Sequence, residues 1–385
     1  MDERTTGDGD DAGADAGGGR LRRALTGRRG RAALAGGLAV ALVAGWLLIR
    51  AVDDADAAKR YCWGAWSEQD EPSLLLERDD RAFRETAPTP ERPRGSCTIT
   101  ASRTYGTDET IPEKISVSYG TGPKDAKKRR AWLAGLFAGA RDQLPEGLPG
   151  FVSQGSATLV LPEKCDVDGR PSVVTVSGVQ SDNKGDTARL PNVSSEPWKA
   201  GQVLIKVANR GMEKAGCAPE KPLGFTAPIV PGHAPDTTFA TSFSPGACRI
   251  DGLGPAPRRG EEDEEGLHSV VGPVGDDLQT CVVRWYEDMA AQFTMTAQPR
   301  LVKLFDGLTG GAPLARGWRG QGYADTDGAL VRTGCAGRTT VMFMERTAIA
   351  KATPFATPSR VFPGYATAVA KRLGCAAVTP HGDST

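Results

Sequence analysis

The sequence predicts an α+β protein: an N-terminal transmembrane helix, then two similar disulfide-stapled domains, each an antiparallel sheet with helices packed on one face. Three observations carry this prediction. An apolar stretch follows an Arg-rich segment, eight cysteines form two parallel sets of four, and a helix-like run ending on Gly-Cys closes each set, at Cys217 and Cys375. A chain of 385 residues also exceeds the length of one average domain.

The apolar stretch Ala32–Ile49 predicts the membrane helix. It carries no charge over 18 residues and would extend about 27 Å as a helix, close to the roughly 30 Å of a hydrocarbon core. Residues 20–31 contain six arginines and no acid, whereas three aspartates lie in residues 53–56. Excess arginine marks the cytoplasmic side, so we expect a cytoplasmic N-terminus. A cleaved signal peptide with a small-residue site at 55–57 is the alternative, but the apolar run favours an uncleaved anchor.

The remaining composition predicts the domain limits. The first 19 residues are rich in Gly, Asp and Ala, which cannot bury enough apolar surface to order the chain. Six prolines in 219–247 indicate a stiff connection, with edge strands from "GFTAPIV" or "TTFATSF" as the alternative. We expect a disordered cytoplasmic tail with a basic juxtamembrane end (1–31), the membrane helix (32–49), extracytoplasmic domain 1 (55–218), a Pro-rich linker (219–243), extracytoplasmic domain 2 (244–376) and a tail (377–385).

The cysteine spacing indicates a duplication. Successive intervals are 35, 68 and 52 residues in the first set and 33, 54 and 40 in the second. An even number of cysteines outside the membrane favours disulfides, and four cysteines in a domain permit three pairings. We predict that the first pairs with the second and the third with the fourth: Cys62–Cys97, Cys165–Cys217, Cys248–Cys281 and Cys335–Cys375. No C-x₂-C spacing supports zinc.

Local sequences repeat in the same order. "SCTIT" matches "TCVVR", "LAGLF" matches "LVKLF", "ATLVLPEKC" matches "GALVRTGC", "VVTVSGV" matches "TTVMFME", and "AGC" matches "LGC". A repeat this large indicates a pair of domains rather than a solenoid. Each half therefore has a strand at its second cysteine, a second strand, a helix, two strands joined by a turn, and a final helix.

Periodicity and turn residues support these elements. Residues 132–140 and 204–215 place apolar side chains at helical spacing. "DVDG" at 166–169 supplies turn chemistry. Gly216 and Gly374 follow the final helices, where a C-cap needs positive φ. Mixed strands and helices of this kind favour an antiparallel sheet with a helical layer.

A basic cluster precedes the first helix of domain 1. Such a helix start could contact anionic lipid head groups or an anionic wall polymer, and positive charge there opposes the helix macrodipole. A solvated helix edge is the alternative, and only Arg300 and Lys303 remain at this place in the second half. The cations are Lys124, Lys127, Lys128, Arg129 and Arg130.

No motif predicts catalysis, a cofactor or a metal. The three histidines, His233, His268 and His381, lie in expected loops and in the tail, outside any two-histidine metal motif. The Ser-x-x-Lys and Ser-Asp-Asn signatures of serine β-lactamases overlap in "SDNK" at 181–184, whereas the enzymes need them on separate elements. No phosphate-binding glycine loop occurs.

Two acidic stretches also lack ligand spacing. "EEDEE" at 261–265 and "DTDG" at 325–328 do not provide the spaced oxygens and distal glutamate of a calcium loop. We interpret them as an acidic loop and a turn. The net charge of zero gives no bulk attraction to nucleic acid.

The cysteine and strand plan resembles small extracytoplasmic domains of actinobacterial membrane proteins and lipoproteins. "YCWGAWSEQDEPSLLLE" at 61–77 and the later "SCTIT" carry the resemblance. The chain departs from those domains because it lacks a lipid-attachment cysteine and doubles the domain, and its second copy lacks the Leu-rich segment. The resemblance implies a cell-envelope location.

We therefore predict a non-catalytic binding or interaction module of the bacterial cell envelope. It would be a single-pass protein with a cytoplasmic N-terminus and an extracytoplasmic C-terminus. Its partners would be the cytoplasmic membrane and an envelope protein, a wall polymer or a lipid, without nucleic acid. The alternatives are an envelope enzyme that lacks a recognisable motif and a carrier of an apolar ligand in a cavity between sheet and helix.

Overall fold

The computed structural model covers much of the chain beyond the expected anchor. Residues Lys59–Thr385 form one compact unit. The expected tail and Ala32–Ile49 lie outside the described residues, and none of the described helices combines the length and hydropathy that a membrane span needs. Described are residues 60–67, 81–105, 109–153, 155–181, 187–189, 197–229, 248, 250, 267–286, 288–308, 312–351 and 355–380.

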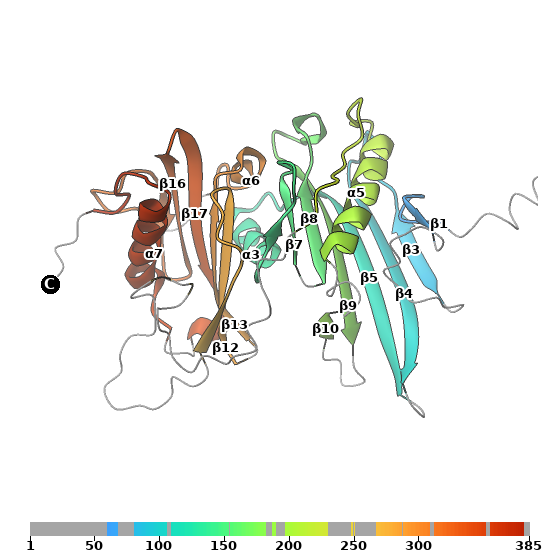
Figure 1. Cartoon of the computed structure of the whole chain (residues 1–385), viewed down its shortest axis with the longest axis horizontal. Helices are drawn as coiled ribbons and strands as arrows, with labels where there is room; N and C mark the ends of the chain where they lie inside the picture. Colours follow the sequence, from blue (N-terminus) through green and yellow to red (C-terminus); the bar gives the residue numbers. More distant parts are fainter. Residues whose placement is uncertain are drawn as a thin grey trace, which may run out of the picture. The chain divides into compact units, whose positions relative to one another are not determined.

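The first half contains an eight-stranded antiparallel sheet (Figure 1). Its strand order is β3-β4-β5-β9-β8-β7-β6, and β10 pairs with the far end of β9. A two-stranded hairpin, β1 and β2, precedes it. The strands are β1 (Arg60–Tyr61), β2 (Trp66–Ser67), β3 (Ala82–Thr86), β4 (Gly95–Tyr105), β5 (Glu109–Thr121), β6 (Asp142–Gln143), β7 (Gly150–Ser153), β8 (Ser156–Val160), β9 (Ser172–Ser181) and β10 (Thr187–Arg189).

The second half contains a seven-stranded antiparallel sheet of order β11-β12-β13-β17-β16-β15-β14. The strands are β11 (Leu267–Val271), β12 (Leu278–Trp285), β13 (Asp288–Thr296), β14 (Ala312–Pro313), β15 (Gln321–Ala324), β16 (Gly328–Cys335) and β17 (Arg338–Arg346). In each half one helix follows the third strand of the sheet, β5 or β13, and another helix lies at the end of the half. These helices are α3 (Ala126–Leu136), α5 (Pro197–Lys214), α6 (Pro299–Lys303) and α7 (Pro358–Arg372).

The two sheets share one connectivity. In each sheet, three neighbouring strands are followed by a helix and then by four more strands. The fourth of these, β9 or β17, pairs with the strand that precedes the helix, β5 or β13. This identical order supports the duplication that the cysteine spacing indicates, and the prediction of two antiparallel sheet domains is confirmed. The limits predicted for those domains stay a prediction, because residues 230–247 lie outside those described.

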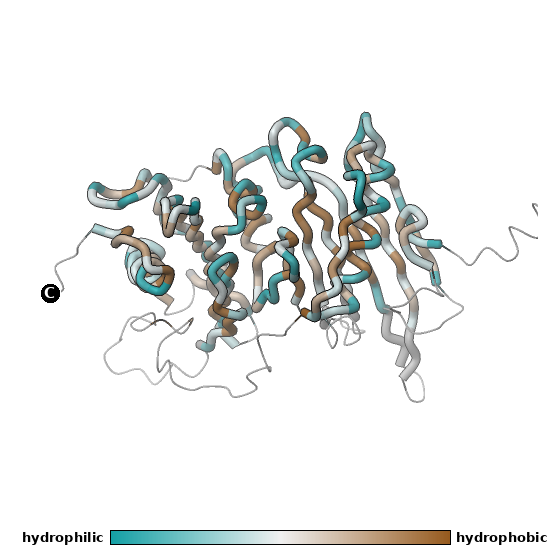
Figure 2. Tube along the Cα trace, turned by 45° about the horizontal axis from the view of Figure 1, so that its top comes forward, coloured by the Kyte–Doolittle hydropathy of each residue, from teal (hydrophilic) through white to brown (hydrophobic). Residues whose placement is uncertain are grey.

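Helices contact both faces of each sheet, which corrects the prediction of helices on one face. One face of sheet 1 packs on α5 through one buried apolar cluster, and one face of sheet 2 packs on α7 through another. A third cluster joins α3 and α6 to the opposite faces of both sheets. Apolar residues run along the central strands, whereas the loops at the strand ends are hydrophilic (Figure 2). Because successive side chains of a strand point to opposite faces of the sheet, a strand with a helix on each face buries side chains on both faces.

Local sequence explains where the helices begin and end. Asp125 caps α3 by accepting a hydrogen bond from the Lys128 backbone N–H at 2.8 Å, so a negative charge offsets the cations at the positive end of the dipole. Gly216 and Gly374 follow α5 and α7 with φ of +72° and +67°. Both glycines have the positive φ that the sequence predicts for these helix ends.

All four predicted cysteine pairs lie at bonding distance. The Cα–Cα separations are 5.1 Å for Cys62–Cys97, 5.2 Å for Cys165–Cys217, 5.5 Å for Cys248–Cys281 and 5.1 Å for Cys335–Cys375. In the second pair of each half, the bridge ties the end of the last helix to the end of the β8 or β16 segment. Chain-entropy arguments give about 3–4 kcal/mol for loops of this length.

The first part of the expected linker packs onto domain 1. Phe225 and Ile229 are buried against the α5 cluster. Asn209 of α5 donates to the Leu223 carbonyl at 2.8 Å and accepts from its N–H at 2.9 Å. Residues 224–229 therefore pack on α5 as irregular chain, and no strand occurs in this described part of "GFTAPIV".

Candidate functional site

The basic cluster at the start of α3 does not form one surface. Lys124, Lys127 and Lys128 are exposed, whereas Arg129 and Arg130 retain only 9% and 8% of their exposure. The two arginines are therefore buried and do not belong to the exposed basic surface. The predicted contact with an anionic surface stays a prediction.

Arg130 instead reaches carboxylates of the second half. Its Nη1 lies 2.7 Å from Asp325 Oδ2 and its Nε lies 3.2 Å from Glu345 Oε2. The guanidinium also lies over the Tyr323 ring, 4.8 Å from the centroid, a cation–π contact. Arg130 of α3 therefore contacts three residues of the second half: Tyr323 on β15, Asp325 in the turn that follows it, and Glu345 on β17.

Within this cluster, Glu345 is the residue whose surroundings disfavour an ionised carboxyl group. Burial raises the pKa of its carboxyl to about 7, and the Arg130 charge offsets only part of that effect. Asp325 and Asp327 raise the pKa further because they are negative neighbours. At neutral pH, deprotonating Glu345 therefore costs folding free energy.

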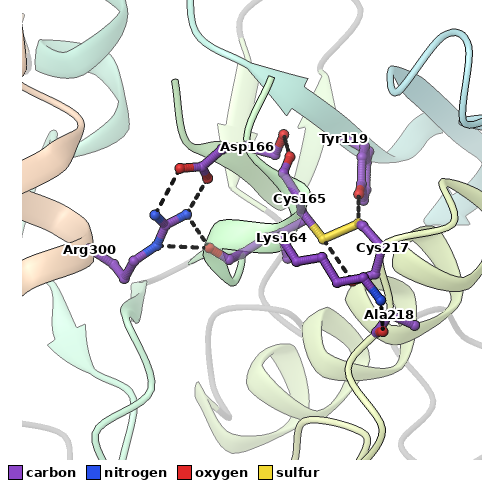
Figure 3. Close-up of a disulfide and its surroundings, with 9 residues drawn as sticks. Tyr119, Lys164, Cys165, Asp166, Cys217, Ala218 and Arg300 are labelled. Atoms are coloured by element: carbon purple, nitrogen blue, oxygen red, sulfur yellow. Dashed lines mark hydrogen bonds and ion pairs between the residues drawn. A yellow bond between two sulfur atoms is a disulfide. The ribbon is translucent and has the colours of Figure 1, made fainter. Parts of the chain in front are cut away.

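Arg300 makes the reciprocal contact from α6 to the first half (Figure 3). Its Nε donates to the Leu161 carbonyl at 2.9 Å, and its Nη1 and Nη2 lie 3.1 and 2.5 Å from the Asp166 carboxylate oxygens. Asp166 follows Cys165 directly, so this pair attaches the second half beside the Cys165–Cys217 bridge. Lys303 adds contacts to Asp166 and to the exposed Glu163.

Apolar packing reinforces the two arginine contacts. Phe137, just after α3, stacks on Phe305, just after α6, with centroids 5.8 Å apart, and the sequence repeat makes these two residues equivalents. Phe137 also packs on Phe151 of sheet 1, and Phe305 packs on Phe343 of sheet 2. All four rings belong to the buried cluster between the sheets, so the halves pack as one body.

The acidic turn at 325–328 serves this contact too. Asp325 Oδ1 accepts the backbone N–H groups of Asp327 and Gly328 at 2.9 and 2.8 Å, which closes the turn. His268 lies partly buried on β11, whereas His233, His381, residues 182–184 and residues 261–265 lie outside those described. Among the described residues no group of three or more His, Cys, Asp or Glu side chains could hold a metal ion.

Sheet 1 keeps an open polar area on the face opposite α5. Two rows of directly paired hydroxyl residues cross β4, β5 and β9. We call this surface the hydroxyl face. Its rows are Ser96–Ser118–Thr175 and Thr98–Ser116–Ser177.

The hydroxyl face is regular and accessible. Ser96 and Ser118 are exposed and the other four members are half-buried. Sheet geometry spaces such positions about 4.8 Å apart across strands and about 7 Å apart along a strand. Ser118 Oγ and Thr175 Oγ1 lie 2.6 Å apart, so neighbouring hydroxyls are close enough to bond.

Cations flank this surface. Arg84 of β3 pairs directly with Thr98, and Lys114 of β5 lies two residues from Ser116 on the same side of the sheet; both are exposed. No Asp or Glu points to this face from the strand residues whose side chains are described, since Glu85 and Glu113 occupy the opposite side.

A cavity of about 350 Å³ adjoins the hydroxyl face at the end of β3, β4 and β5. Thr86 lines this cavity and pairs directly with Ser96 of the hydroxyl face. Further lining comes from Glu91, Arg92 and Arg94.

A tight turn fixes the two arginines of this cavity. Thr89 N–H donates to the Arg92 carbonyl at 3.0 Å, and Thr89 Oγ1 accepts from the Arg92 N–H at 3.1 Å. Gly120, with φ of +150°, leaves room for the Arg94 side chain, whose Cγ would lie 3.2 Å from a Cβ there. Backbone and hydroxyl hydrogen bonds lower the pKa of Glu91, so its carboxylate stays ionised.

The equivalent face of sheet 2 is filled by the first half. Thr280 and Gln292, which match Ser96 and Ser116, are buried. Thr280 Oγ1 accepts the Arg141 N–H at 3.1 Å, and Gln292 Oε1 accepts the Gly139 N–H at 3.2 Å. The segment after α3 thus covers in sheet 2 the positions that stay open in sheet 1.

No protein-family model, curated protein or solved structure matches the chain. The candidate site therefore depends on geometry alone. Sequence reasoning did not find the hydroxyl face, although the alternation "SCTITAS" and "ISVSY" places Ser and Thr on one side of two strands. That pattern indicates a strand with a polar side, but it does not say which copy keeps that side uncovered.

Proposed function

We propose that the chain is a membrane-anchored, extracytoplasmic binding module whose first half presents the binding surface. The apolar stretch Ala32–Ile49 and the excess of arginine before it support the anchor and its orientation. Four cysteine pairs at bonding distance support an oxidising compartment. The second half supports the first and orients it.

One observation carries this proposal: the duplicated sheet face is open in the first half and buried in the second. Ser118 is exposed, whereas its equivalent Thr294 has no exposed surface. The second half uses this face to hold the first half, through Thr280 and Gln292. The first half keeps the same face free, next to a cavity lined with arginines.

The chemistry of the open surface favours binding over catalysis. A hydrolytic site needs a general base close to a nucleophile, and the described hydroxyl face combines its hydroxyls with neither His nor carboxylate. The cavity beside it combines threonines and charged groups with the apolar side chains of Ala87, Pro93 and Val167.

Two measurements on the full chain in intact cells test the proposal. Disulfide-linked peptides identified by non-reducing mass spectrometry should join the four predicted pairs, and free thiols at these cysteines would contradict the extracytoplasmic location. A photo-crosslinking amino acid at Ser118 should give covalent adducts, whereas one at Lys371, exposed on α7, should give none. Equal capture at both positions, or none at either, would contradict a binding surface on the hydroxyl face.

A further inference from the structure

We infer that the hydroxyl face and its adjoining cavity bind an acidic polysaccharide, with a sugar carboxylate in the cavity and the sugar chain across the hydroxyl rows. This inference rests on the proposed function, because it assigns a ligand class to the same surface. It follows from four properties of the site: the arginines, the hydroxyl rows, the charge distribution and the size.

The arginines supply an anion site. Arg92 and Arg94 are exposed and line the cavity, and the positive charge of Arg92 contributes to the lowered pKa of Glu91. A guanidinium matches a carboxylate with two parallel hydrogen bonds. The hydrogen-bonded turn from Thr89 to Arg94 fixes the backbone that carries both groups, so part of the ordering cost of binding is already met.

Glu91 favours a sugar acid over a bare anion. Its ionised carboxylate lines the same cavity and can only accept hydrogen bonds. The Glu91 carboxylate would repel an anion that has no hydrogen-bond donors to offer. A sugar acid carries hydroxyl donors on the ring that bears the carboxylate, so one residue of the chain can face Glu91 and the arginines together.

The hydroxyl rows match the rest of a sugar chain. Each Ser or Thr hydroxyl is one donor and two acceptors, as a sugar hydroxyl is. Ser118 and Thr175, 2.6 Å apart on adjacent strands, show that neighbours within a row lie within bonding reach. An array repeated over three strands suits a ligand that repeats its own hydroxyls, such as a polysaccharide.

Charge separates an acidic polysaccharide from a neutral one. Arg84 stands at the β3 end of the hydroxyl row farther from the cavity, Lys114 lies one row beyond it, and no described carboxylate shares that face. Cations at both ends would attract a chain with a negative charge on each sugar, and this attraction would weaken with added salt. The cavity volume of about 350 Å³ lies within the range of small-ligand sites, roughly 300–1,000 Å³.

The test is a binding measurement on the full chain in lipid nanodiscs, with oligogalacturonate as the carboxylated probe. Dextran is the neutral probe and inorganic polyphosphate the phosphate probe. Oligogalacturonate should bind, dextran should bind at least about 10-fold more weakly because it lacks the charged hydrogen bonds, and salt should weaken the oligogalacturonate complex. Equal binding of dextran, or tighter binding of polyphosphate, would overturn the inference.

Matched arginine variants place the ligand on the surface. The double variant Arg92→Ala, Arg94→Ala should weaken oligogalacturonate binding about 10-fold or more. The double variant Arg316→Ala, Arg319→Ala removes two exposed arginines of the second half and should leave binding unchanged. Unchanged thermal unfolding of both variants controls for folding, and equal losses of binding would overturn the assignment.

Hydroxyl variants test the sugar contacts separately. Ser96→Ala with Ser118→Ala should weaken oligogalacturonate binding a few-fold and leave its salt dependence unchanged, because the charged contacts remain. An unchanged affinity would show that the hydroxyl rows are not part of the binding site. If no glycan binds while crosslinking at Ser118 still captures a protein, the inference fails and the proposed function stands. If crosslinking at Ser118 also fails, both fail.

Discussion

The two halves share their strand order but use the same sheet face in opposite ways. In sheet 2, Thr294 and Gln292 have no exposed surface and Glu345 takes part in an ion cluster with Arg130 of the other half. The equivalent residues of sheet 1, Ser118 and Ser116, face solvent in full or in part. One copy of a duplicated domain can thus use a sheet face to hold its neighbour while the other copy keeps the same face open.

The largest expected effect comes from breaking the apolar contact between the halves. Phe137→Ala should lower the free energy of unfolding by about 4 kcal/mol, because Phe137 is fully buried and packs on Phe151 and Phe305. Phe83→Ala, at a ring that is 46% exposed on the edge strand β3, should cost under about 1 kcal/mol. Denaturant unfolding of the full chain in detergent measures both, and equal losses would mean that Phe137 does not hold the halves together.

Breaking the ionic contact should cost somewhat less. Arg130→Ala leaves Asp325 and Glu345 mostly buried without their cation, and we expect a loss of about 3 kcal/mol. Lys128→Ala, on the exposed side of the same helix, should stay within about 0.5 kcal/mol of the unsubstituted chain. The same titration measures both variants, and a loss for Lys128→Ala as large as for Arg130→Ala would speak against this comparison.

The pH dependence of stability should also distinguish the halves, since Glu345 corresponds to Ser177 in the first half. The folded protein raises the pKa of Glu345 to about 7, so the folded state holds its proton more tightly than the unfolded chain does. This contribution is fully present below about pH 4.5 and is lost as pH rises to about 7.

Glu345→Gln removes this titration. Relative to the variant, the unsubstituted chain should lose on the order of 2 kcal/mol of stability between pH 5 and pH 7.5. Unfolding titrations at the two pH values measure the difference. Parallel pH profiles for the two proteins would show that burial does not hold a proton on Glu345.

The smallest expected effect compares two equivalent hydroxyls. Thr280→Val removes the acceptor of the buried Arg141 N–H and should cost about 1–2 kcal/mol. Ser96→Ala, at the matching exposed position, should change the free energy of unfolding by less than about 0.5 kcal/mol. Equal costs in thermal unfolding would imply that sheet 1 is covered in the same way as sheet 2.

Local signals in the sequence predict much of each half. The parallel intervals of the cysteines indicate the duplication, the four predicted pairs lie at bonding distance, and Gly216 and Gly374 mark the helix ends because positive φ needs glycine there. The short edge strands β6 and β14 carry no such signal, since each has two residues and owes its pairing to β7 or β15.

The candidate site depends on information that a local pattern does not contain. Arg129 and Arg130 extend a row of lysines in the sequence, yet both are buried, and Arg130 bonds to carboxylates of the second half. The alternating Ser and Thr of β5 predict a polar side of a strand. Whether a neighbouring segment covers that side is decided by residues more than a hundred positions away, such as Gln292 beneath Gly139.

The central claim is that equivalent positions are open in the first half and filled in the second, and a charge at each position tests it most directly. Ser118→Glu and Thr294→Glu place the same carboxylate on the same strand of each sheet. We predict that Ser118→Glu keeps the free energy of unfolding within about 0.5 kcal/mol, whereas Thr294→Glu lowers it by more than about 3 kcal/mol because a buried carboxylate lacks a partner. Comparable stabilities for the two variants would contradict the account.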